Sequence, residues 1–101
     1  MFTFEDLQWR ARPVPPEEYH IWIKQYPKVP DFGVYALMQF SNGYGVQVAR
    51  GSQTIGGPEL FEVRVLDAEG KYCDTTSVAN GAVGNLNIAG VTNYMSQIQS
   101  L

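Results

Sequence analysis

Cysteine and histidine are nearly absent from this chain, and their scarcity removes two kinds of site. The 101 residues include one cysteine, Cys73, and one histidine, His20. A single cysteine excludes an internal disulfide and a cysteine-based zinc site. With a single histidine, a metal site would depend on carboxylates, and no cluster of them stands out. The sequence therefore predicts neither a bound metal nor a cofactor.

Charge and long apolar runs are also scarce. Charged residues make up 17% of the chain, and seven basic against ten acidic residues give a net charge of −3. This balance disfavours binding to nucleic-acid phosphates and is too weak for DNA mimicry. No apolar run approaches the roughly 18 residues of a membrane span, and no secretion signal or glycosylation motif is seen. We expect a cytoplasmic protein.

Apolar residues are plentiful, and they are spaced as in a folded domain. They make up 45% of the chain, and 101 residues suit one domain with one core. The clearest element is Val34 to Arg50, two strands joined at Asn42-Gly43, a pair that tolerates positive φ. Alternation of side chains favours a three-residue loop with a left-handed Gly43 and a G1 bulge. The predicted pairs are Val46 with Met38 and Val48 with Ala36.

Two elements are predicted before this hairpin. Residues Phe4 to Val14 alternate and predict a first strand, although a short helix opening at Thr3 is an alternative. A short amphipathic helix is predicted at about residues 16–26, after a proline and acid start signal. The aromatic-rich stripe of this helix consists of Tyr19, Trp22, Ile23 and Tyr26.

The next segment predicts a second hairpin. After the flexible stretch Gly51 to Pro58, the run Phe61 to Asp67 alternates as a strand. Asp67 to Gly70 then predicts a turn with a left-handed Gly70. The inward residues of this strand are predicted to be Phe61, Val63 and Val65. Across the turn, Cys73 is expected opposite Val65 and Thr75 opposite Val63.

The last segment predicts a loop and then a helix. Val78 to Asn87 is rich in Gly and Asn and predicts a loop, and a helix follows from Ile88 or Ala89 to Ser100 with Asn87 as its N-cap. The apolar stripe of the helix is Ile88, Val91, Met95, Ile98 and Leu101. The predicted fold is α+β: an antiparallel sheet of four or five strands with an N-terminal short helix and a C-terminal helix packed on the sheet.

Three groups of residues have the residue types or spacing of a catalytic or phosphate-binding site. Cys73 with His20 and Asp74 has the residue types of a nucleophilic triad, but Cys73 is predicted to face the core, where a thiol is inert. Gly51 and Gly56 have phosphate-loop spacing, but glycine stands where that motif needs lysine. The acid pairs Glu5-Asp6 and Glu17-Glu18 are explained by solvated charge and by the helix dipole. The sequence predicts no enzyme.

The face of the sheet that points away from the C-terminal helix carries more large apolar groups than an open face usually shows. It is predicted to hold Tyr35, Leu37, Gln39, Leu66 and Tyr72, with Glu62 and Arg64. Either the N-terminal helix covers this face or a partner does. Tyr44 and Asn42 at the hairpin tip are further candidate contacts. The predicted partner-binding residues are Tyr35, Leu37, Asn42, Tyr44, Arg64 and Tyr72.

Several stretches resemble small, mostly uncharacterised bacteriophage-encoded proteins. They are FSNGYGVQV, LFEVRVLDAEGKYCDTT, a loop containing Val83-Gly84, and the closing helix. Together they cover about Phe40 to Leu101. The chain departs from that pattern in having no acidic residue after Leu86. The resemblance implies a phage protein that acts in the cytoplasm of a host cell.

These observations favour a protein that binds and inhibits a host protein or protein complex, such as a defence nuclease, in the manner of an anti-CRISPR protein. A homo-oligomeric phage structural or assembly protein, using a sheet edge or the apolar face, is the first alternative. A small nucleic-acid-binding module is the second, with aromatic rings as stacking groups, although the net charge opposes it. Its stacking and basic residues would be Trp9, Tyr35, Tyr44, Tyr72, Arg10, Arg12 and Arg50. A small enzyme using Cys73 or an acid pair is the last.

Overall fold

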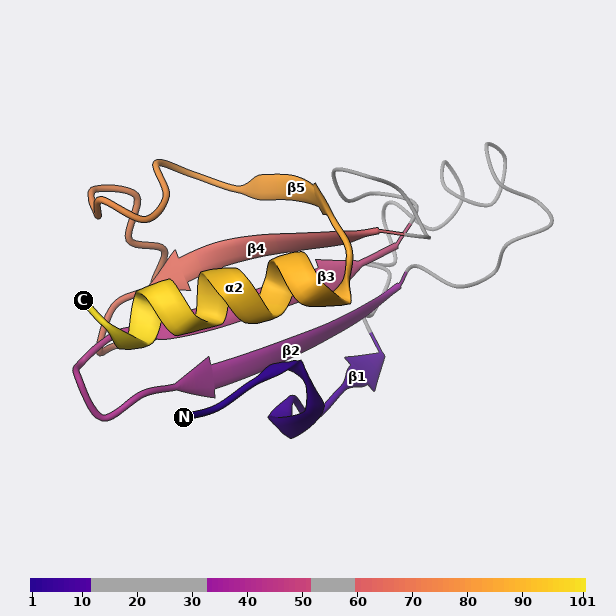
Figure 1. The fold of residues 1–101 in the computed structure, drawn as a ribbon, viewed down its shortest axis with the longest axis horizontal. Coiled ribbons are helices and arrows are strands. Elements are labelled where there is room, and N and C mark those ends of the chain that lie inside the picture. The colour runs from indigo at the N-terminus through magenta and orange to yellow at the C-terminus, as the bar shows by residue number, and fades with distance from the viewer. Residues whose placement is uncertain (12–32, 52–59) are drawn as a thin grey trace, which may run out of the picture.

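The sheet is built in chain order, because each strand runs antiparallel beside the strand before it. The computed structural model describes residues 1–11, 33–51 and 60–101. Its elements are the 3₁₀ turn η1 (Phe4–Asp6), strands β1 (Arg10–Ala11), β2 (Val34–Gln39), β3 (Gly45–Arg50), β4 (Phe61–Leu66) and β5 (Val83–Leu86), and helix α2 (Ile88–Gln99). The spatial order is β1-β2-β3-β4-β5. Figure 1 shows α2 lying across one face of this sheet.

The predicted α+β class is confirmed, with five strands among the described residues and a C-terminal helix packed on the sheet. The predicted helix at residues 16–26 lies outside the described residues. So do residues 52–59, which contain most of the predicted Gly51 to Pro58 connection.

The central hairpin has the predicted register. Met38 pairs with Val46 and Ala36 with Val48, and Gly43 is left-handed with φ of 87°. The Phe40 amide donates to the Tyr44 carbonyl at 2.8 Å, which closes a three-residue loop. The turn chemistry of Asn-Gly and the alternation of the flanking strands thus select the same pairing.

The second hairpin is confirmed only close to its turn. Gly70 is left-handed, and the Asp67 amide donates to the Lys71 carbonyl at 2.8 Å. Cys73 lies opposite Val65, to whose carbonyl its amide donates at 2.9 Å. The prediction that Thr75 lies opposite Val63 is wrong, because Val83 pairs with Val63 instead. Past a single bridge at Tyr72 the chain leaves β4, and β5 takes the neighbouring place.

Strand β5 lies inside the segment Val78 to Asn87, which the sequence predicts as a loop. Its pairing to β4 shifts register between Phe61 and Val63, and Asn85 has a positive φ of 60°. Such an irregularity admits a residue type that regular strands disfavour, and Asn tolerates the left-handed conformation. The Gly and Asn content that predicts a loop is therefore compatible with an irregular edge strand.

The predicted strand Phe4 to Val14 is wrong at its start, where Phe4–Asp6 forms the 3₁₀ turn η1. The Thr3 amide donates to the Asp6 carboxylate at 2.8 Å, and the Asp6 amide donates back to the Thr3 carbonyl at 3.0 Å. These reciprocal bonds close η1, the turn that the alternative at Thr3 anticipated. Strand structure in the described N-terminal residues is limited to Arg10–Ala11.

Helix α2 begins where expected, at the Asn87 N-cap, whose side chain accepts from the Gly90 amide at 2.8 Å. The middle of its apolar stripe is fully buried on β3 and β4, at Val91, Met95 and Ile98. Both ends of the predicted stripe are exposed, Ile88 at 51% and Leu101 at 37%. The fully buried part of the stripe thus spans about two turns of the helix, from Val91 to Ile98.

The core lies between α2 and the sheet. Alternation places one face of β2, β3 and β4 toward the helix, as the period of two requires. The buried cluster is Leu7, Ala36, Phe40, Val46, Val48, Phe61, Val63, Val65, Ala79, Val91, Met95 and Ile98. The predicted inward residues of the second hairpin's first strand are all in this set.

Candidate functional site: the open face of the sheet

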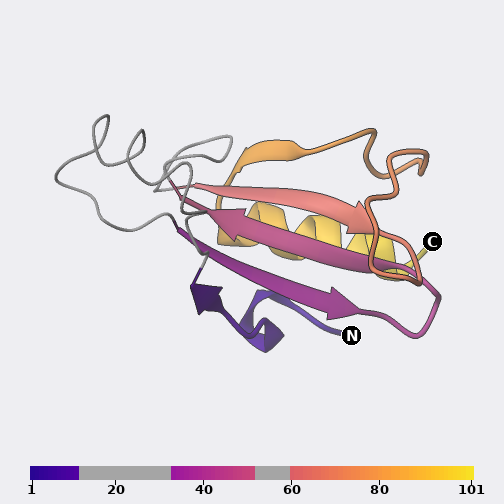
Figure 2. The same cartoon turned by 180° about the vertical axis from the view of Figure 1, so that it is seen from behind.

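The face of the sheet opposite α2 carries apolar and aromatic side chains in rows that cross the strands. Figure 2 shows this face from behind, without the helix in front of it. One row consists of Leu37 on β2, Gln47 on β3 and Arg64 on β4, which are paired directly across the strands. Leu37 is 56% exposed, which is high for a large apolar side chain on a strand.

The next row ends at the second hairpin. Gln39 pairs with Gly45, Gly45 with Leu66, and Leu66 with Tyr72. Tyr72 is 52% exposed, whereas Leu66 is almost fully buried. Between these two rows and the second hairpin lies a shallow hollow of about 420 Å³. It is lined by Tyr35, Leu37, Gln47, Leu66, Gly70, Lys71 and Tyr72.

Arg64 holds the aromatic side of this hollow in place. Its guanidinium carbon lies 3.7 Å from the centre of the Tyr72 ring, a close cation–π contact. The Arg64 Nη2 atom also donates to Asp74 Oδ2 at 3.1 Å. A planar guanidinium can stack and donate at the same time, so Arg64 orients Tyr72 without needing a partner molecule.

Four of the six predicted partner-binding residues therefore lie together on the open face: Tyr35, Leu37, Arg64 and Tyr72. The other two do not join them. Tyr44 lies two residues before Val46, so its side chain is on the same face as that of Val46. It packs partly against the core on the α2 side. Asn42 donates through Nδ2 to the Ile98 carbonyl at 2.8 Å and thus ties the hairpin tip to the end of α2.

Four lining residues were not among the predicted contacts: Gln47, Leu66, Gly70 and Lys71. Gln47 could have been predicted from the sequence, because it stands between Val46 and Val48 on β3 and its side chain must therefore lie on the opposite face of the sheet. A smaller hollow of about 120 Å³ adjoins the same face beside β1 and is lined by Gln8, Arg10, Tyr35 and Leu37. The pairing of Arg10 with Tyr35 creates it, and the sequence carried no register signal for so short a strand.

The candidate catalytic residues have structural contacts. Cys73 is partly buried against the core, with its Sγ 3.9 Å from Thr75 Oγ1. The carboxylate of Asp74 is bound by Arg64, and that of Asp6 by the Thr3 amide. His20 and Glu17-Glu18 lie outside the described residues. Among residues 1–11, 33–51 and 60–101, no group of three or more His, Cys, Asp or Glu side chains could hold a metal ion.

Asp67 lies at the rim of the open face, in the second turn. Its Oδ1 accepts from the amides of Lys71 and Glu69, each at 2.9 Å. The bond from the Lys71 amide is the main cause that lowers the pKa of Asp67 below its usual 3.8, with the Glu69 amide adding to it. The carboxylate is an acceptor that fixes the turn.

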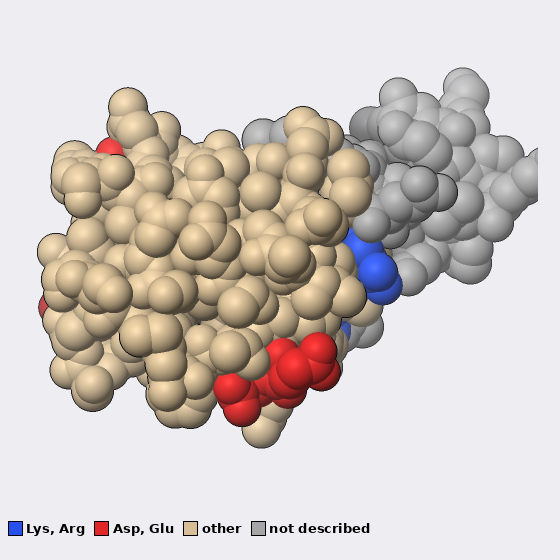
Figure 3. Space-filling model, viewed as in Figure 1, with Lys and Arg blue, Asp and Glu red and all other residues tan. Residues whose placement is uncertain are grey.

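The face that carries α2 differs in character from the open face. Figure 3 shows it as mostly uncharged, with acidic side chains gathered over the N-terminal part of the chain and basic ones at the edge of the described region. Acidic Glu5 and Asp6 belong to η1. In the described part of the chain, no helix has the length and apolar character needed to cross a membrane.

Comparison with known proteins gives no relative from which a function could be carried over. No protein-family model, no curated protein and no solved structure matches this chain. The resemblance to bacteriophage proteins therefore remains a prediction from the sequence.

Proposed function

We propose that this chain is a non-enzymatic protein-binding domain that docks a partner protein on the open face of its sheet. The observation that carries the proposal is the pair of half-exposed side chains Leu37 and Tyr72, which flank one shallow hollow. Large apolar groups gathered on a strand face of a small domain are typical of interaction surfaces.

The composition of this face supports a protein as the partner. Tyr and Arg are enriched among residues that dominate binding energy, and here Arg64 already stacks on Tyr72. A side chain held in place before binding loses little entropy when a partner arrives. A partner with an apolar projection that fits beside Leu37, and with polar groups for Gln47 and Lys71, would match the lining.

The more specific form of this function is a bacteriophage-encoded inhibitor of a host factor, of which an anti-CRISPR-type antagonist of a defence nuclease complex is one example. Its support is the sequence resemblance together with the small size of the chain. Binding alone suffices for such a role, since a domain that covers a functional surface inhibits without chemistry of its own.

The test is capture of a partner from bacterial lysate, followed by reconstitution of the complex from purified components. Leu37→Asp places a charge in the centre of the proposed surface and is expected to weaken the reconstituted complex at least tenfold, about 1.4 kcal/mol. Ile88→Asp is the matched control, because Ile88 is similarly exposed at 51% but lies on α2. The control is expected to bind as the unmodified protein does.

Equal binding by Leu37→Asp and the unmodified protein would rule out the open face as the docking surface. Light scattering separates the homo-oligomer alternative: a dimer that Leu37→Asp dissociates would show that the partner is a second copy of this chain. Capture of nucleic acid alone, sensitive to salt, would instead favour the nucleic-acid-binding alternative.

A further inference from the structure

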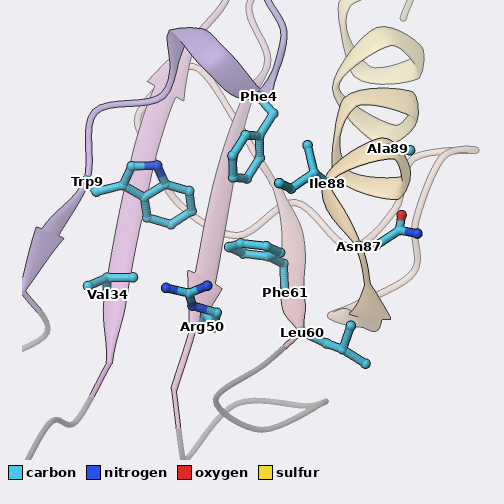
Figure 4. Close-up of a pocket in the computed structure, with 9 residues that line it drawn as sticks. All are labelled: Phe4, Trp9, Val34, Arg50, Leu60, Phe61, Asn87, Ile88 and Ala89. Carbon is cyan, nitrogen blue, oxygen red and sulfur yellow. The ribbon is translucent and has the colours of Figure 1, made fainter.

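A larger hollow lies on the opposite side of the sheet, where α2 begins. Strands β2 and β4 extend past the first turn of α2 (Figure 1), and the rings of Phe4 and Trp9 pack there against Phe61 of β4. We call this space the aromatic hollow, and its volume is about 710 Å³. It is lined by Phe4, Trp9, Val34, Arg50, Leu60, Phe61, Asn87, Ile88 and Ala89 (Figure 4).

Three rings form one wall of the aromatic hollow. Phe4 meets Phe61 edge to face, with ring centres 5.1 Å apart, and Trp9 lies 5.6 Å from each of them. These separations are those of favourable aromatic pairs. Phe61 belongs to the buried core and Phe4 and Trp9 pack against it, so the wall is formed without a ligand.

Arg50 supplies positive charge at the same place. Its guanidinium carbon lies 5.1 Å from the centre of the Phe61 ring, and its side chain is visible beside that ring in Figure 4. Arg50 is the only charged residue among the described residues that line the hollow. The first turn of α2 carries no acidic residue, so no carboxylate there opposes an anion.

We propose that the aromatic hollow binds a small flat aromatic anion, with its rings against Trp9 and Phe61 and its carboxylate, sulfonate or phosphate on Arg50. The volume is within the range of small-molecule sites, which are mostly apolar with a few polar groups that fix orientation. A guanidinium is suited to this role because it binds planar anions through two donors. This site is separate from the open face and independent of a protein partner there.

A matched pair of fluorescent probes tests the proposal. Anilinonaphthalene sulfonate is an aromatic anion, and N-phenylnaphthylamine has nearly the same rings without the charge. We expect the folded protein to bind the sulfonate at least tenfold more tightly than the neutral probe. Amide shifts in NMR spectra are expected at Phe4, Trp9, Phe61 and Ile88, and dispersed spectra throughout the titration exclude dye uptake by a partly unfolded state.

Substitutions then locate the charge. Arg50→Gln is expected to weaken binding of the sulfonate about tenfold and to change binding of the neutral probe less than twofold. Lys71→Gln removes the same charge from the open face and is expected to leave both affinities unchanged. Ile88→Glu puts a carboxylate at the mouth of the hollow, where the helix dipole favours it, and is expected to reduce sulfonate binding while the fold is kept.

Three results would overturn the proposal. Equal affinity for both probes would show an apolar site without anion preference. An equal loss in Arg50→Gln and Lys71→Gln would show attraction to overall charge alone. Binding of neither probe would show that the hollow is not open to a ligand, as when other residues of the chain fill it.

Discussion

Asn42 at the tip of the first hairpin binds Ile98 in the last turn of α2, across 56 positions in the sequence. The Asn42 Nδ2 atom donates to the Ile98 carbonyl at 2.8 Å and to the Leu101 carbonyl at 3.3 Å, while its Oδ1 accepts from the Tyr44 amide at 3.1 Å. Carbonyls in the last turn of a helix lack partners within the helix. One side chain thus shapes the turn and caps the helix.

We therefore expect Asn42→Ala to lower the free energy of unfolding by about 1–2 kcal/mol, since it removes both functions. Chemical denaturation measures the change. Ser41→Ala, in the same turn and exposed, is the control and should have little effect. Equal unfolding midpoints for the two variants would show that the Asn42 side chain contributes nothing to stability.

Gly33 and Gly43 both have positive φ, but their surroundings differ. A Cβ on Gly33, where φ is 115°, would overlap the carbonyl oxygen of Arg50 and lie 2.8 Å from the Cα atom of Gly51. A Cβ on Gly43, where φ is 87°, would meet nothing within 4 Å. Gly43→Ala should therefore cost only backbone strain, about 1 kcal/mol, and Gly33→Ala clearly more, above about 2 kcal/mol. Thermal unfolding of both variants tests this order, and a reversed order would contradict the close approach of the two strands at Gly33.

Met95 joins α2 to the sheet. Its side chain is fully buried, as are those of Val91 and Ile98, its neighbours in the apolar stripe of the helix. Met95→Ala should lower the free energy of unfolding by about 2–5 kcal/mol, through lost burial and the cavity left behind. Ile88→Ala, on the same helix but 51% exposed, should change it by less than about 0.5 kcal/mol. Similar losses in both variants would mean that α2 does not pack through the face described.

The Asp67 carboxylate makes the second turn sensitive to acid. Because the pKa of Asp67 is lowered in the folded state, its contribution to stability is complete above the usual value of 3.8. The contribution is lost as the pH falls from there through the folded-state pKa. Asp67→Asn keeps an oxygen acceptor for the two amides but cannot titrate, so its stability should fall less between pH 5 and about 2. Denaturant midpoints measured across this pH range would reveal the difference, and parallel pH curves would contradict it.

Local chemistry and alternation were enough to predict most of the central structure. The Asn-Gly turn, the parity of Val46 and Val48, and the Asn87 cap each act within a few residues, and each is found as predicted. The open face follows from the same parity, since a strand that buries Ala36 must turn Leu37 the other way. Local rules work here because a hairpin register is determined by its turn.

Features that depend on distant contacts could not be predicted in this way. Strand β5 takes its place beside β4 although its own residues are typical of a loop, because the unpaired edge of β4 offers backbone partners. The bond from Asn42 joins the middle of the chain to the end of α2, and the aromatic hollow brings N-terminal residues beside the start of the same helix. The sequence by itself determined the turns, the faces of the strands and the start of the helix, since these depend on neighbouring residues. Only the tertiary structure decided the edge strand, the helix cap and the hollow, since each exists only where separate segments meet.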